Sequence, residues 1–464
     1  MGVLKKKKLE TLNVYFAIAI GLLITSRLIT FIAFPNPTSS PDSPTYFAGK
    51  FLDFSLVSFS GGASRGWPVP FVYAFMPNLE ILELFQLLLS AIAWSFLLLT
   101  TYIVKLIPNK QNNYLILLIA LLGSSSQVIQ HDTSVLATSI TNSIFILLIA
   151  FLIKAKYVMK SQKKNLVAAL SCAALLMIQK TSFIPIAIAL SLLLFYIVFK
   201  HVSTLTRVSS FGILICLTLY AAFVGSNVNS NWQISYSGQT LLWHLGGQSP
   251  SAAEFSAYLQ KRKAPTCLTL EAPYQNINTS IGKILNSCPE ARPYLKKEIQ
   301  RDFVNFIISN PTEAAKLSIY GMGAALTSSA TNYGSAVSIV PKFVDDIFFG
   351  STTPDLRSQN VSDQVSGLNT FKSGTAFWLS VPFVGWFLLM MVSALLRGRE
   401  RKDDSFLYLI LALCLIQSVM AVILLPSEWV RQTAPFLISA LVTTVVLTFK
   451  NITAVFSKVT KSDT

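Results

Sequence analysis

The residue best placed to do chemistry in this chain is a carboxylate that directly follows the first long apolar stretch. It is Asp42, in the segment Ser40-Pro41-Asp42-Ser43-Pro44-Thr45-Tyr46. A carboxylate partly removed from water at a membrane surface accepts a proton more readily than a hydrated one. Asp42 is therefore a candidate general base. The alternative is structural, because an acid before an apolar run can also cap the start of a helix.

Basic residues in three other segments are candidates to bind an anionic group. Arg65, Lys180 and Arg431 are all predicted on the same outer membrane surface as Asp42. Cations held in a site of low dielectric constant stabilise negative charge that develops during a reaction. Glu428 is close enough in the sequence to orient Arg431. Each cation has an alternative role as an anchor beside lipid headgroups.

The composition assigns these residues to a membrane protein. Of the 464 residues, 52% are hydrophobic and only 12% are charged, which is far from the average of soluble domains. About ten apolar stretches approach the roughly 18 to 20 residues that cross a bilayer as a helix. We expect an all-α polytopic membrane protein with spans at 13–34, 79–104, 113–130, 134–153, 165–179, 184–199, 208–225, 374–396, 405–425 and 434–449.

The distribution of lysine and arginine predicts the orientation. Alternate loops are rich in basic residues, whereas the short loops between them hold only Lys50, Arg65, Lys180 and Arg431. Cytoplasmic loops carry such an excess, so we expect an integral plasma (inner) membrane protein with both termini in the cytoplasm. The same loops account for much of the net charge of +16. We therefore expect the lipid bilayer as a partner and no nucleic acid.

Two outer segments divide the chain into five parts. These are the cytoplasmic start with the first span (1–34), a first outer loop (35–78), spans two to seven (79–225), a larger mixed outer segment (226–373), and the last three spans with a cytoplasmic tail (374–464).

Each outer segment has one local feature that predicts structure. From Tyr46 to Leu56, apolar residues alternate with Lys50 and Asp53, a pattern typical of a short helix in the membrane interface. In the larger segment, Cys267 and Cys288 are close enough in sequence for an oxidising compartment to join them. Two free thiols are the alternative.

Four segments of the chain carry short motifs that are informative together. The PDSxxY pattern that ends at Tyr46 is followed by the re-entry Gly66-Trp67-Pro68. Arg301 to Leu317 reads as a helix ending in Asn-Pro that closes the outer segment. Gln179 to Pro185 has a basic residue at an outer span end, and Ser427 to Pro435 is similar to an ExRYxxP pattern that opens the last span. Together these segments resemble the GT-C class of membrane glycosyltransferases, which use polyprenyl-phosphate-linked sugars, and in particular its bacterial members similar to dolichyl-phosphate-mannose mannosyltransferases.

Two positions depart from the family pattern. Trp429 to Gln432 replace the tighter Glu-x-Arg-Tyr spacing, and Thr138 stands where many relatives have a glutamate. These departures bear on metal binding and on the contacts with the donor. They also keep open a family member that has lost activity and serves as an assembly partner.

The resemblance implies an inverting transferase that moves a hexose or pentose from a polyprenyl-phosphate donor to a lipid, glycan or protein acceptor at the outer membrane face. Asp42 would be the base, and the residues that bind substrate would be Tyr46, Arg65, Lys180, Glu428 and Arg431. No metal site is predicted. A divalent cation between Asp42 and Asp132, near His131, is the alternative if these loops meet.

Two other membrane functions compete with this interpretation. One is a transporter or flippase of a lipid-linked substrate, which would need ionisable residues inside facing spans. Only Arg27 clearly meets that condition in the sequence, and it is expected to pair inside the bundle. The other is an oligosaccharide polymerase or ligase, which would differ in using a preassembled glycan as its donor.

Overall fold

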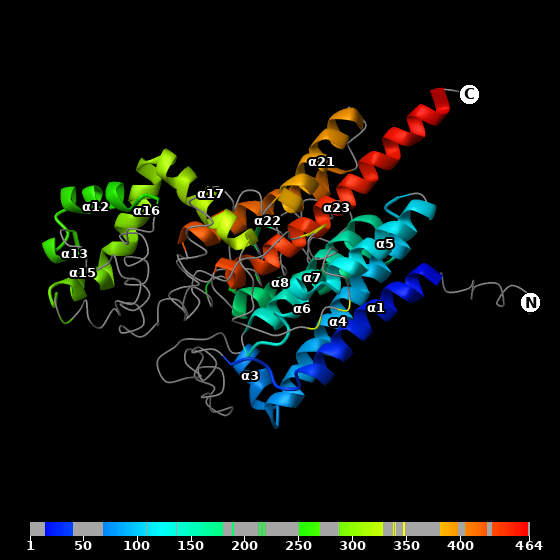
Figure 1. Ribbon diagram of the computed structural model, residues 1–464, viewed down its shortest axis with the longest axis horizontal. Helices are drawn as coiled ribbons and strands as arrows, with labels where there is room; N and C mark the ends of the chain where they lie inside the picture. Colours follow the sequence, from blue (N-terminus) through cyan, green and yellow to red (C-terminus); the bar gives the residue numbers. More distant parts are fainter. Residues whose placement is uncertain are drawn as a thin grey trace, which may run out of the picture.

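A computed structural model shows the chain as an assembly of helices (Figure 1). The structure describes residues 14–39, 68–107, 109–135, 137–179, 250–269, 288–327, 381–397, 404–424 and 429–462, with isolated residues at 188, 189, 212, 215, 216, 219, 286, 337, 339, 347 and 348. In these parts of the chain every regular element is a helix, apart from one isolated parallel bridge between Thr38 and Ser134. The all-α prediction is confirmed for the described residues.

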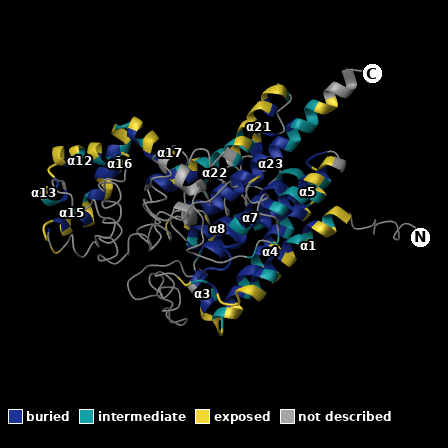
Figure 2. Ribbon diagram, in the orientation of Figure 1, coloured by how far each residue is buried: buried dark blue, intermediate teal, exposed yellow. Residues whose placement is uncertain are grey.

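Five helices of the described chain are long and apolar enough to cross a membrane. They coincide with five of the predicted spans, and α23 is longer than expected. The two most enclosed are α7 and α23, whereas α1 lies on the outside of the bundle (Figure 2). The five helices are α1 (Val14–Ala33), α4 (Leu79–Val104), α7 (Ala137–Tyr157), α22 (Ser405–Leu424) and α23 (Trp429–Ser462).

Three further predicted spans are shorter helices, namely α5 (Asn109–Gly123), α8 (Gln162–Gln179) and α21 (Val381–Arg397). The predicted span at 113–130 differs from the structure, because its helix ends at Gly123 and a separate short helix, α6 (Ser126–Ile129), follows. Ser125 between them is extended, with φ −66° and ψ 147°, so the helix cannot continue through it. The predicted spans 184–199 and 208–225 lie mostly outside the described residues.

Local capping explains where several helices begin and end. The side chain of Asn78 accepts a hydrogen bond from the Ile81 N–H at 2.8 Å and caps α4, as asparagine does at many helix starts. Lys105 ends α4 in the left-handed conformation with φ 49°. Pro311 opens α17 (Pro311–Thr327), because a first helical residue needs no donor inside the helix.

Basic side chains gather at one end of the bundle, which we call the basic end. Lys154 and Lys156 lie in the last turn of α7. The Nζ atom of Lys450 in α23 lies 5.5 Å from the ring centre of Tyr157. The fully buried carboxylate of Asp404 forms ion pairs with Arg397 of α21 and with Lys450. These contacts bring the C-terminal parts of α7, α21 and α23 together.

A smaller helical unit from the predicted large outer segment lies beside the bundle, at the left of Figure 1. Its core includes Phe255 and Phe303, whose ring centres are 5.3 Å apart. Leu317 of α17 and Ile423 of α22 belong to the same apolar cluster and join the unit to the bundle. The helices of the unit are α12 (Ala252–Lys261), α13 (Thr266–Thr269), α15 (Ala291–Lys297) and α16 (Ile299–Ser309).

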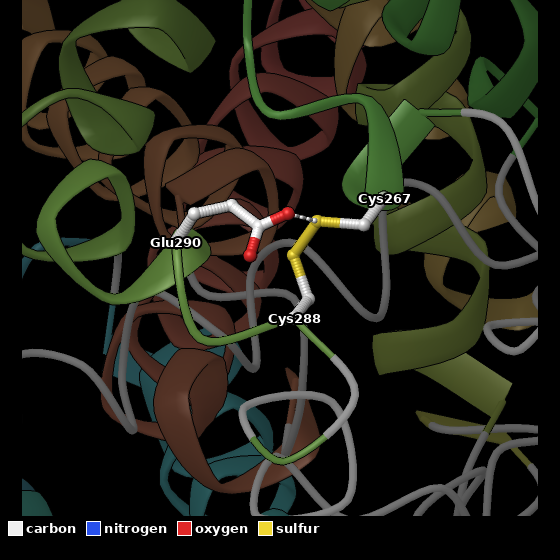
Figure 3. The surroundings of a disulfide bond; sticks show 3 residues. All are labelled: Cys267, Cys288 and Glu290. Atoms are coloured by element: carbon white, nitrogen blue, oxygen red, sulfur yellow. Dashed lines mark hydrogen bonds between the residues drawn. A yellow bond between two sulfur atoms is a disulfide. The ribbon is translucent and has the colours of Figure 1, made fainter.

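Covalent and polar links hold this unit together. The predicted disulfide between Cys267 and Cys288 is present, with the Cα atoms 6.0 Å apart (Figure 3). It closes a loop of 21 residues and thereby restricts the unfolded chain. Asp302 accepts hydrogen bonds from Arg262 at 3.2 and 3.3 Å and from the Tyr294 hydroxyl at 2.7 Å. This buried acid therefore connects α12, α15 and α16.

We predict that Gly123→Ala destabilises the bundle. A Cβ atom added at Gly123 would lie 2.7 Å from the side chain of Trp94 and 2.9 Å from that of Leu23, and overpacking of this kind costs about 1–3 kcal/mol. The Tm of the purified protein should fall. Gly21→Ala is the matched control, because nothing lies within 4 Å of the added atom and alanine favours a helix over glycine. Equal Tm values for the two variants would contradict this packing.

Candidate functional site

A buried charged cluster joins four segments of the bundle. Arg27 of α1 donates from Nε and Nη2 to the Oγ atom of Ser90 in α4, at 3.2 and 2.9 Å. Its Nη2 atom lies 3.7 Å from the Oδ2 atom of Asp132, and neither side chain is more than 3% exposed. Ser139 in the first turn of α7 donates to the Oδ1 atom of Asp132 at 3.3 Å. The cluster is therefore nearer the end of α7 that lies opposite the basic end.

The segment before α7 is bonded directly to the start of the predicted first outer loop, and through Gln86 of α4 to its end. Thr38 donates its N–H to the Thr133 carbonyl at 2.8 Å and accepts from the Val135 N–H at 3.0 Å. The Nε2 atom of Gln86 lies 3.1 Å from the carbonyl oxygen of Ser134, to which it donates, and 2.8 Å from the hydroxyl of Tyr73. Tyr73 belongs to α3 (Pro68–Ala74). Residues 133–135 thus connect the chain after α1 with the chain before α4.

Two further helix ends contact α7. The Nε2 atom of Gln179, the last residue of α8, donates to the Thr141 hydroxyl at 2.6 Å and to the Ala137 carbonyl at 3.1 Å. In α23, the ring of Phe436 lies 5.4 Å from the ring of Phe145 in α7. The first half of α7 is therefore the shared support for the end of α8 and the start of α23.

Burial changes the protonation of two residues in the turn before α7. It raises the pKa of Asp132 to about 6, although Arg27 and the hydroxyl groups of Ser90 and Ser139 act in the opposite direction. Asp132 is then still mostly ionised at neutral pH and can pair with Arg27. Burial also lowers the pKa of His131 to about 4, so its imidazole is neutral. In the structure both side chains are enclosed.

The predicted site residues are not among those whose side chains the structure describes. Asp42, Tyr46, Arg65, Lys180 and Glu428 lie outside the described residues. Arg431 belongs to α23, but its side chain is outside the described part. The roles of all six residues stay predictions, and the structure bears only on the segments that flank them.

The expected pairing of Arg27 inside the bundle is confirmed by its contacts with Ser90 and Asp132. Sequence analysis missed Glu83 and Gln86 of α4, which are both 0% exposed. The sequence did contain a signal, because placing an acidic residue inside an apolar span costs free energy and such residues usually have a function. The predicted span 79–104 contains Glu83.

An apolar groove of about 610 Å³ runs between α1 and α4. Isoleucine, leucine and phenylalanine side chains line most of it, and Arg27 contributes to the lining together with Ser95. A groove of this composition can accommodate a hydrocarbon chain. It reaches the same arginine that pairs with Asp132.

Among the described residues, one group of potential metal ligands lies close together, formed by Cys267, Cys288 and Glu290 (Figure 3). The Oε1 atom of Glu290 lies 3.3 Å from the sulfur of Cys267. The sulfur atoms form a disulfide, and thiolates rather than disulfides bind metals. We therefore assign this group to the disulfide and not to a metal site. The alternative cation between Asp42 and Asp132 is not tested, since Asp42 lies outside the described residues.

No protein-family model, curated protein or solved structure matches the chain. What is established is a helical protein with several helices apolar enough to span a membrane. Any finer assignment depends on the sequence motifs and on the geometry described above.

We predict that breaking the buried pair destabilises the protein. Arg27→Met would leave the Asp132 carboxylate unpaired, and Asp132→Asn would leave the guanidinium unpaired, each at a cost of about 3–5 kcal/mol. The double variant removes both charges and should recover part of that loss. The Tm values of the purified wild type, single and double variants test the coupling. Strictly additive losses would contradict a direct interaction.

Proposed function

We propose that the chain is a membrane glycosyltransferase of the GT-C type, which transfers a hexose or pentose from a polyprenyl-phosphate donor with inversion. One observation carries the proposal: the described residues next to three predicted site segments are linked to residues 133–141, directly at Thr38 and Gln179 and through Gln86 of α4 at α3. Thr38 precedes Asp42 by four residues, α3 begins three residues after Arg65, and Gln179 directly precedes Lys180. Separate loops that carry the candidate base and cations thus share one support.

Chain length supports convergence of these groups. Four residues of extended chain span at most about 14 Å, which limits how far Asp42 can lie from Thr38. Lys180 is bonded covalently to Gln179, whose side chain contacts the first turn of α7. Arg431 belongs to the first turn of α23, which packs against α7 through Phe436.

The proposed reaction is a single displacement at the anomeric carbon. Asp42 accepts the proton of an acceptor hydroxyl, whose oxygen then forms a bond to the anomeric carbon. The bond between that carbon and the phosphate oxygen breaks on the opposite face, and its electron pair remains on the phosphate. Arg65, Lys180 and Arg431 would stabilise this negative charge. The apolar groove beside Arg27 suits the hydrocarbon chain of such a donor.

We infer that the basic end faces the cytoplasm and that the Asp132 cluster is nearer the outer face. Cytoplasmic segments are enriched in lysine and arginine, and Lys154, Lys156 and Lys450 lie together at the basic end. This orientation corresponds to about ten spans, cytoplasmic termini and insertion in the plasma (inner) membrane. A lipid, glycan or protein acceptor would then be used at the outer face.

A transporter or flippase of a lipid-linked substrate is the second candidate. The observation that favours it is the enclosed carboxyl group of Glu83 in α4, because ionisable residues inside spans often mark transport pathways. A transporter needs two compartments, whereas a transferase forms product in detergent solution as well. A polymerase or ligase would use a preassembled glycan in the same detergent assay.

We predict that Asp42→Asn lowers sugar transfer by about 10²–10⁴-fold, which is the usual contribution of a general base. Membranes from expressing cells would supply the acceptor, and loss of labelled sugar from a polyprenyl-phosphate donor would be followed. Asp53→Asn is the matched control, since Asp53 is an acid in the same outer loop, and it should retain activity. Near-normal transfer by Asp42→Asn, at equal protein levels, would refute the base assignment.

A further inference from the structure

An acidic side chain inside α4 has no visible structural role. Glu83 is 0% exposed, and neither of its carboxyl oxygens has a hydrogen-bond partner among the residues that the structure describes. Buried polar groups in folded proteins are almost always hydrogen-bonded, and exceptions call for an explanation. An unpaired buried carboxyl group costs free energy because it has lost its water. Such a group is expected where a ligand provides the missing donors.

A second unpartnered acceptor lies one turn along the same helix. Gln86 donates through Nε2 to the Ser134 carbonyl, and a carbonyl can only accept, so the orientation of this amide is determined. Its Oε1 atom is buried and has no hydrogen-bond partner in the described part of the chain. Residues three apart on a helix are neighbours, with Cβ atoms about 5–6 Å apart. Glu83 and Gln86 therefore present acceptors from adjacent positions on α4.

The surroundings of these two residues belong to the candidate site. Ser90 lies seven residues after Glu83, on the same side of α4, and binds Arg27. Gln86 contacts Ser134, which forms the bridge with Thr38. The polar side chains of α4 therefore lie beside the turn before α7. The same turn is bonded to Thr38, at the start of the first outer loop.

We propose that Glu83 and Gln86 form a binding site for the hydroxyl groups of a sugar. The proposal rests on the proposed function, since it assigns these residues to the sugar carried by the polyprenyl phosphate. Three unpartnered oxygen acceptors match a ligand rich in hydrogen-bond donors. A phosphate is a poor match, because it offers mainly acceptors to a site that already presents acceptors. A metal site is not supported, because the described residues around Glu83 form no group of metal ligands.

The test combines stability with ligand binding in full-length protein in nanodiscs. Glu83→Met removes an unpaired buried carboxyl group and keeps a similar volume, so the ligand-free Tm should stay equal or rise by about 1–4 °C. Glu80→Gln is the matched control, because Glu80 is an exposed acid in the same helix, and its Tm should not change. A clear fall in the Tm of Glu83→Met would assign the carboxyl group to structure and overturn the proposal.

Binding is measured as the increase in Tm on adding polyprenyl phosphate, either free or carrying glucose, mannose or arabinose. In Glu83→Met, affinity for the sugar-carrying probes should fall by about tenfold or more, as expected when the hydrogen bonds of a buried carboxyl group to the sugar are lost. Affinity for free polyprenyl phosphate should not change. Equal responses of wild type and Glu83→Met to the sugar probes would overturn the sugar site alone. If no sugar probe shifts the wild-type Tm, the sugar site and the proposed function both fail.

Discussion

The pairing of Arg27 with Asp132 is the interaction on which the end of the bundle opposite the basic end depends. Two charges buried in a membrane protein are stable only when each satisfies the other, so α1 cannot move relative to the turn before α7 without exposing both. Ser90 and Ser139 add hydrogen bonds from α4 and α7. The turn held in this way is the one that bonds to Thr38. A single ion pair therefore helps to fix the position of the chain after α1, where the first outer loop begins.

Much of the helical arrangement could be predicted because crossing a bilayer imposes a minimum apolar length. The first span was expected at 13–34 and is observed at 14–33, and the bounds of α4 agree with the prediction. The expectation failed at 113–130, where Ser125 interrupts a run that is otherwise apolar enough to continue. A mean hydropathy taken over the whole span does not reveal one such residue. Its backbone conformation depends on the tertiary contacts of α5 and α6.

The candidate site was less accessible to prediction. Arg27 could be identified as a residue that needs a partner, but its partner lies 105 positions later in the chain, and no periodic pattern identifies that residue. Glu83 was missed because one acidic residue near the start of a long apolar span has little effect on the mean hydropathy of that span. The disulfide was predictable because its two cysteines lie close together in sequence. Short-range chemistry was thus visible in the sequence, and long-range pairing was not.

The disulfide between Cys267 and Cys288 also has a consequence for the sidedness of the whole molecule. Such bonds persist outside the reducing cytoplasm, which agrees with the proposed placement of this helical unit at the outer face. That unit joins the bundle through Ile423, near the last residue of α22, whereas Asp404 and the basic end lie at the first. Thiol oxidation and the lysine distribution are independent of each other, yet both favour the same polarity across the membrane. In this orientation the basic end and the helical unit lie on opposite sides of the membrane, whatever the number of spans.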